Sequence, residues 1–141
     1  MAATGHAKWT GDLESGEAKI DTGSGLVTGT VTAASRFADG EGTNPEELLG
    51  AAHAACFSMA LTLVLGEAGH DSESIETEAT VYLRKVEDGF EIHKIELDTV
   101  GTVPGISDED FQKFAGMAKD GCPVSKALAG PEITLEAKLA S

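Results

Sequence analysis

Hydrophobic and polar residues alternate along several stretches of the chain and follow helical spacing along others. Alternation is the pattern of a half-buried strand, and apolar residues at intervals of three and four are the pattern of a helix. The strands predicted in this way are residues 6–13, 17–21, 25–33, 74–86, 90–100 and 133–139. The helices predicted begin near residues 44 and 107, and a short helical turn follows residue 122. We expect an α+β fold with mainly antiparallel strands around one central helix.

The central helix has a clear start and is apolar on nearly every side. Asn44 can cap it, Pro45 suits its first position, and Glu46 and Glu47 lie in the first turn, where the helix dipole favours acids. From residue 48 to 65 nearly every residue is apolar or small, and Gly66 or Gly69 ends the helix. We expect protein on all sides of such a helix. A chain of 141 residues does not easily provide that cover, which favours a homodimer.

The remaining elements carry smaller predictions. The strands at 74–86 and 90–100 form a hairpin, and a slip in the apolar positions indicates a bulge near His93 and Lys94. Residues 35–45 are expected to be a loop, because paired Asp-Gly and Glu-Gly steps mark turns there. In the second helix we expect Phe111, Phe114 and Met117 to face inward.

Composition narrows the class of protein. The length predicts a single domain over residues 1–141. The net charge of −14, with only ten Lys and Arg, argues against nucleic acid as a partner. The N-terminus has no apolar segment of a secretory signal. The longest apolar run, at 54–65, contains Ser58 and Thr62 and is too short to span a membrane. We therefore expect a cytoplasmic protein that does not bind a membrane.

Two cysteines, Cys56 and Cys122, are the candidates for chemistry. Two are too few for a disulfide scaffold, and their surroundings lack metal-ligand spacing, so no metal is expected. A thiol inside a helix such as Cys56 is more often an inert core residue. Cys122 precedes Pro123 at a predicted helix N-terminus, where backbone N–H groups stabilise a thiolate. The two sulfurs could form a disulfide if the helices bring them together.

His53, Arg36 and Glu47 are the other polar candidates. His53 lies one helical turn before Cys56, so a Cys–His hydrolase or transferase is an alternative reading. A stress protein whose thiols are only core residues is another. Arg36 lies in the loop before the central helix and could form a bidentate pair with Glu47.

Helix geometry limits how Glu47 could serve Cys56. The two residues are nine positions apart, which is about 13.5 Å of rise and places them on opposite sides of the helix. If Arg36 and Glu47 act on Cys56, we expect them to come from the partner chain of a two-fold dimer.

Several motifs together resemble the OsmC branch of the OsmC/Ohr family of thiol peroxidases. These are TNPEELLGAAHAACFSMAL with Arg36 upstream, TVPGI at 102–106, and GCPVSKAL at 121–128. The resemblance extends over essentially the whole chain, from HAKWTGDLESG to EITLEAKL.

The resemblance implies an OsmC-like fold in an intertwined homodimer, with two active sites at the subunit interface. It implies that Cys56 is the peroxidatic cysteine and Cys122 the resolving one, and that Arg36 and Glu47 hold the site in its reactive arrangement. The implied activity is reduction of hydroperoxides, organic ones preferentially, in protection against oxidative stress. No cofactor is implied, and the reductant would be an external dithiol such as a dihydrolipoyl protein.

Overall fold

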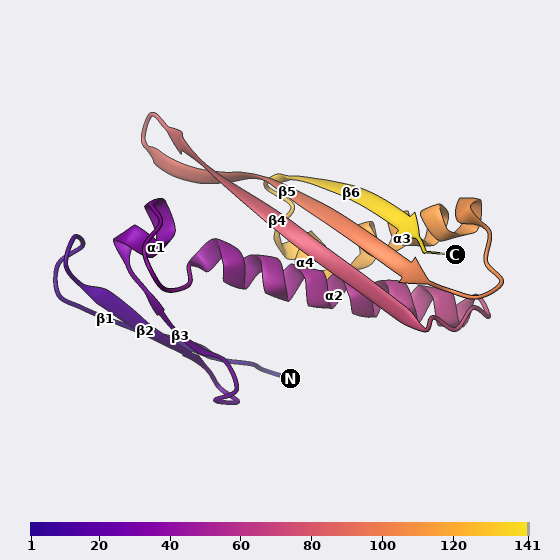
Figure 1. Cartoon of the computed structure of the whole chain (residues 1–141), viewed down its shortest axis with the longest axis horizontal. Helices are drawn as coiled ribbons and strands as arrows, with labels where there is room; N and C mark the ends of the chain where they lie inside the picture. Colours follow the sequence, from indigo (N-terminus) through magenta and orange to yellow (C-terminus); the bar gives the residue numbers. More distant parts are fainter. Residues whose placement is uncertain (141) are drawn as a thin grey trace. The chain divides into compact units, whose positions relative to one another are not determined.

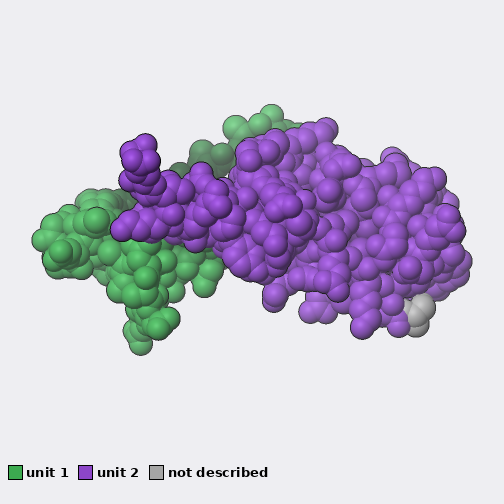
Figure 2. Space-filling model, turned by 90° about the horizontal axis from the view of Figure 1, so that it is seen from above, with its two compact units in different colours: residues 1–48 green, residues 49–141 purple. Residues whose placement is uncertain are grey.

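The computed structural model describes residues 1–140, which divide into two compact units. The first unit ends at Leu48 and the second begins at Leu49 (Figure 2). Each unit has one three-stranded sheet. The long helix α2 (Pro45–Glu67) begins in the first unit and continues in the second.

The first unit is an antiparallel meander followed by a short helix. Its strands are β1 (Gly5–Thr10), β2 (Glu17–Thr22) and β3 (Thr28–Val31), paired in that order. The three predicted strands are confirmed: β1 and β3 are shorter than predicted, and β2 is one residue longer. Helix α1 (Ala33–Phe37) occupies part of the segment predicted to be a loop. It forms because Thr32 and Ser35 cap each other: each side-chain oxygen accepts a hydrogen bond from the other's backbone N–H.

The second unit has a sheet in the order β4-β5-β6, and its strands are β4 (Ser74–Val86), β5 (Gly89–Thr102) and β6 (Glu132–Leu139). The first pair is antiparallel and the second is parallel. Tyr82 pairs with Lys94 and Leu83 with Ile92, which leaves His93 as the extra residue of a bulge. The predicted hairpin and its bulge are therefore confirmed.

Helices α2, α3 (Asp108–Gly121) and α4 (Pro123–Ala127) lie on one face of this sheet (Figure 1). The core is built from residues that are almost completely buried: Phe57, Leu61, Leu65, Ile95, Leu97, Val103, Phe111, Ala115 and Ala118. The α2 members recur every four residues, so a single stripe of the helix enters the core. Phe111 and Phe114 pack inward as predicted, but the prediction is wrong for Met117, which is 50% exposed.

Both ends of α2 are stopped by local hydrogen bonds. At the start, Asn44 Oδ1 accepts the backbone N–H of Glu47 at 2.8 Å, as the predicted cap requires. At the end, the N–H of His70 donates to Leu65 O and that of Gly69 to Gly66 O. Gly69 has φ of 86°, the left-handed conformation of a Schellman motif, so Gly69 rather than Gly66 ends the helix.

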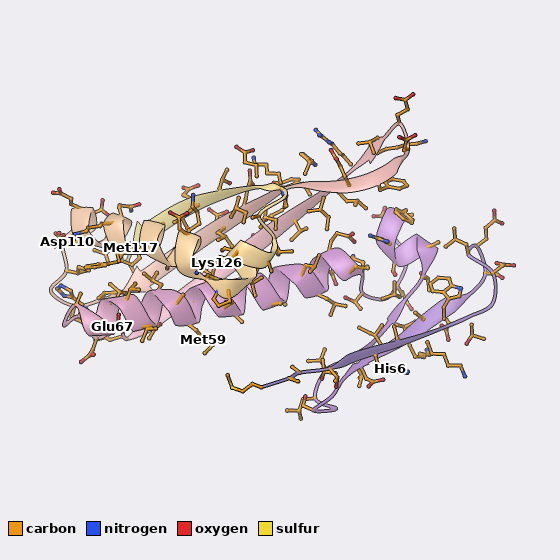
Figure 3. All side chains as sticks on the ribbon, turned by 180° about the vertical axis from the view of Figure 1, so that it is seen from behind. His6, Met59, Glu67, Asp110, Met117 and Lys126 are labelled. Carbon is orange, nitrogen blue, oxygen red and sulfur yellow. The ribbon has the colours of Figure 1, made fainter. Side chains whose placement is uncertain are left out.

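The side of α2 turned away from the β4-β5-β6 sheet is open and apolar. Met59 is 75% exposed and projects away from the sheet (Figure 3), Leu63 is 61% exposed, and Ala52 and Ala55 are exposed too. A single chain therefore leaves this side of the helix uncovered, as expected for a chain of this length, and the predicted cover by a second subunit stays a prediction. At 23 residues, α2 is also long and apolar enough to cross a membrane by length and composition alone, contrary to the estimate from the run at 54–65.

Candidate active site

The two cysteines lie in contact. The Sγ atoms of Cys56 and Cys122 are 2.8 Å apart, and both thiols are free. Cys56 comes from the middle of α2 and is half-buried, whereas Cys122 is fully buried. The expectation that the packing of the helices could bring the sulfurs together is confirmed, and the more accessible of the two is Cys56.

Cys122 occupies the junction between α3 and α4. Its backbone N–H donates to Ala118 O at the end of α3, and its carbonyl accepts the N–H of Lys126 in α4. Pro123 follows at the first position of α4, and the Cys122 side chain makes no capping hydrogen bond. A residue that is C-cap of one helix and N-cap of the next has little freedom, so its sulfur is held in place against α2.

The surroundings shift the pKa values of the two thiols in opposite directions. Burial raises the pKa of Cys56, the hydrogen bond with Cys122 raises it further, and the Val124 N–H lowers it only in part. Burial also acts to raise the pKa of Cys122. Hydrogen bonds from Cys56 and from the backbone and side chain of Ser125 outweigh that effect, and its pKa is lowered. Within one chain Cys122 is therefore the thiol that ionises more easily.

A buried histidine on α2 contacts a buried serine three residues after Cys122. His53 Nε2 and Ser125 Oγ are 2.8 Å apart, His53 is fully buried and Ser125 nearly so. The polar partner of His53 in this contact is Ser125, not a cysteine. Sequence reasoning singled out His53 but missed Ser125, although Ser125 is the last residue of the GCPVS motif.

Arg36 pairs with Glu46, and the expected pairing with Glu47 is wrong within the chain. The guanidinium Nη2 donates to Glu46 Oε1 at 2.7 Å, and Nε lies 3.2 and 3.3 Å from the two carboxylate oxygens. Glu46 is buried and Glu47 is exposed, and Glu47 instead accepts the Thr43 hydroxyl at 2.7 Å. The physical reason is burial, because a carboxylate removed from water needs a cation.

The first unit holds Arg36 where Glu46 can reach it. Ser35 Oγ donates to Thr43 O at 2.7 Å, and Asn44 Nδ2 donates to Ser35 O at 3.3 Å. These bonds connect α1 to the residues just before α2. Among residues 1–140, no three His, Cys, Asp or Glu side chains gather as a metal site requires.

Comparison with known proteins gives a consistent result. A family model described as "OsmC-like protein" matches residues 38–137. Peroxiredoxin OsmC of Escherichia coli (strain K12) is 50% identical over 141 aligned residues, which cover 97% of this chain and 96% of that protein. Organic hydroperoxide resistance protein-like 2 of Staphylococcus epidermidis is 38% identical over 93 residues, covering 64% of this chain and 63% of that protein.

A solved structure shares the fold over nearly the full length. The organic hydroperoxide resistance protein OhrB of Bacillus subtilis has a TM-score of 0.71 at 29% identity, covering 99% of this chain and 98% of that one. The resemblance inferred from the NPEELL, HAACF and GCPVS motifs is thereby confirmed, as is the expected fold. With a family model matched over more than half of its length and a nearly full-length relative at 50% identity, the chain belongs to the OsmC family.

Proposed function

We propose that this chain is a cysteine-based peroxidase that reduces organic hydroperoxides, and hydrogen peroxide less well, through Cys56 and Cys122. The observation that carries the proposal is the 2.8 Å contact between a half-buried sulfur and a fully buried one. A peroxide can approach the first, and the second is already placed to react with the product. The names of the relatives, a peroxiredoxin and organic hydroperoxide resistance proteins, support the substrate class.

The proposed cycle has three steps. The Cys56 thiolate attacks the distal oxygen of the hydroperoxide, the O–O bond breaks, and the alkoxide leaves as an alcohol after protonation. Cys56 is now a sulfenic acid, and Cys122 condenses with it to a disulfide and water. An external dithiol then reduces the disulfide by thiol exchange and is itself oxidised. No cofactor takes part in these steps.

Cys56 needs a positive charge to act as the first thiolate, because its pKa is raised within one chain. Arg36 carries such a charge, and its ion pair with Glu46 of the same chain holds the guanidinium in place. Glu46 and Cys56 are ten residues apart on α2, about 15 Å of rise, so a pair held at Glu46 is distant from the sulfur of its own helix. We therefore propose that Arg36 and Glu46 serve the Cys56 of a second copy.

The open side of α2 supports the homodimer that this arrangement requires. Met59 and Leu63 are large apolar residues, and both are more than half exposed there. A second copy that packed on this side would bury them and complete the cover. Ala52, Ala55 and Met59 also lie within one helical turn of Cys56, so they suit the alkyl group of an organic hydroperoxide.

The same packing argues for a soluble, cytoplasmic protein. The stripe of α2 formed by His53, Phe57, Leu61 and Leu65 is buried in the core of the second unit. A helix whose apolar stripe is already buried in the core of its own chain, with His53 hydrogen-bonded to Ser125 there, does not need lipid to cover that stripe. The reducing cytoplasm would also keep both thiols free between turnovers.

The alternative of a Cys–His hydrolase or transferase receives no support from the geometry. Such an enzyme needs the imidazole beside its nucleophile, whereas His53 Nε2 contacts Ser125.

The test is a single turnover. Reduced protein, kept under anaerobic conditions, is mixed with one equivalent of cumene hydroperoxide, and thiols are counted before mass spectrometry. We expect both thiols to disappear and an intramolecular Cys56–Cys122 disulfide to form. With Cys122→Ser we expect the reaction to stop at a Cys56 sulfenic acid that dimedone traps. Unchanged thiols in the wild-type chain would contradict the proposal. Equal turnover of hydrogen peroxide and cumene hydroperoxide would contradict the proposed preference for organic hydroperoxides.

A further inference from the structure

A line of buried polar groups leads from the core of the second unit to the resolving cysteine. It starts at His53 on α2, passes through the Ser125 hydroxyl on α4, and ends at the sulfur of Cys122. His53 and Cys122 are fully buried and Ser125 is 5% exposed. Hydrophobic residues of the same α2 stripe fill the neighbouring core positions, so burying an imidazole here costs free energy unless its polar atoms are hydrogen-bonded.

His53 satisfies only one of its two ring nitrogens. Nε2 bonds Ser125, whereas Nδ1 is buried and has no hydrogen-bond partner among residues 1–140. Burial also lowers the pKa of His53, so the ring is neutral near pH 7 and carries a single proton. If that proton is on Nε2, the ring donates to Ser125 Oγ, and Nδ1 is left as a bare lone pair, which costs less than a buried N–H without an acceptor.

With this tautomer of His53, the Ser125 hydroxyl oxygen accepts a hydrogen bond from the imidazole. A hydroxyl has one hydrogen, and when its oxygen accepts from His53 that hydrogen is free to donate elsewhere. The Ser125 side chain and backbone N–H both act to lower the pKa of Cys122, which is the direction that favours its thiolate. Without His53 the hydroxyl could rotate and donate to another acceptor.

We propose that His53 is a positioning residue that acts through Ser125 to hold Cys122 as the thiolate that resolves the Cys56 sulfenic acid. The inference rests on the proposed peroxidase cycle. In this step the Cys122 thiolate attacks the Cys56 sulfur, the S–S bond forms and the S–O bond breaks. The hydroxide that leaves takes a proton from solvent and becomes water. The sulfenic sulfur is reduced and the thiolate sulfur oxidised, so no other oxidant or reductant is needed.

The titratable group of α2 that contacts the Cys122 sulfur is Cys56. The hydrogen bond of His53 is to Ser125. The test therefore removes the neighbouring sulfur. In a Cys56→Ser background, the ionisation of Cys122 is followed by thiolate absorbance between pH 5 and 11. We expect His53→Leu and Ser125→Ala each to raise the pKa of Cys122 by about 1 or more, because each breaks the chain of donors. His53→Gln, which keeps an N–H donor, should restore much of the lower value.

A second measurement follows resolution in the presence of Cys56. After one equivalent of cumene hydroperoxide, the sulfenic acid of His53→Leu should persist about tenfold longer than in the wild-type chain near pH 7. Its rate of formation should be unchanged, and raising the pH should remove most of the difference. A merely structural role for His53 would not produce that pH dependence.

The two proposals fail in different ways. If the pKa of Cys122 stays the same in both His53→Leu and Ser125→Ala, the positioning role is wrong whatever the enzyme does. If the wild-type chain forms no Cys56–Cys122 disulfide with hydroperoxide, the peroxidase cycle is wrong, and the titration in the Cys56→Ser background still reports on the hydrogen bonds.

Discussion

At the scale of single residues, two adjacent glutamates at the start of α2 have different surroundings. Glu46 is buried and binds the Arg36 guanidinium through both carboxylate oxygens, whereas Glu47 is exposed and accepts a hydroxyl from Thr43. Removing the charge of a buried partner frees the guanidinium, while an exposed carboxylate contributes little. The residue that fixes Arg36 is therefore Glu46.

We expect Glu46→Gln to lower kcat/KM for cumene hydroperoxide by about tenfold or more, because the guanidinium loses the charge that orients it. Glu47→Gln is the matched control, since it makes the same change one residue away on the exposed side. Steady-state kinetics coupled to a dithiol reductant measures both. If Glu47→Gln lowered kcat/KM more than Glu46→Gln, the carboxylate that holds Arg36 in the active enzyme would be Glu47, as expected from the sequence.

At the scale of elements, β5 and α3 approach closely at Gly101. A Cβ atom there would lie 2.6 Å from Cε2 of Phe111 and 3.1 Å from Cδ1 of Ile75. The absence of a side chain at Gly101 is what lets the Phe111 ring lie this close to β5. Gly116, within α3, has no atom within 4 Å of an added Cβ.

These two glycines give opposite predictions for the free energy of unfolding. We expect Gly101→Ala to lower it by about 1–3 kcal/mol through overpacking. Gly116→Ala should raise it by about 0.5–1 kcal/mol, because alanine restricts the unfolded chain and favours the helix. Urea denaturation followed by circular dichroism measures both changes. If Gly101→Ala were as stable as the wild-type chain, the close approach of β5 to α3 would be wrong.

The elements that could be predicted from sequence are those with a strong local signal. The start of α2 followed from Asn44 and Pro45, and the bulge near His93 and Lys94 from a slip in alternation. Helix α1 was missed because its capping pair uses serine where glutamate is the usual signal, within a segment rich in turn residues. Its absence from the prediction also hid the correct partner of Arg36, since burial of Glu46 depends on tertiary packing that no local pattern records.

At the scale of the whole molecule, the proposed dimer makes a prediction about shared active sites. Arg36→Ala and Cys56→Ser are each expected to abolish most activity as homodimers. If Arg36 serves the Cys56 of the other copy, a mixed dimer contains one complete site, formed by the intact residue of each chain. Random mixing of equal amounts should then recover about a quarter of wild-type activity, because half of the dimers are mixed and each has one of two sites.

The mixing is best done by co-expression with two different tags, so that mixed dimers can be purified and assayed alone. The control is a dimer of one Arg36→Ala chain and one chain that carries both Arg36→Ala and Cys56→Ser. It lacks the guanidinium in both copies. If the purified dimers of one Arg36→Ala chain and one Cys56→Ser chain were inactive, both residues of a site would come from the same chain.

The contact between the two sulfurs also connects the catalytic cycle to chain entropy. Cys56 and Cys122 are 66 residues apart in the sequence, so their disulfide would close nearly half of the chain into a loop. Closing a loop of that length removes freedom from the unfolded state worth about 4 kcal/mol at 25 °C. The oxidised enzyme would then melt at a higher temperature than the reduced one. When peroxide is abundant and reductant scarce, the protein would wait in its most heat-resistant form.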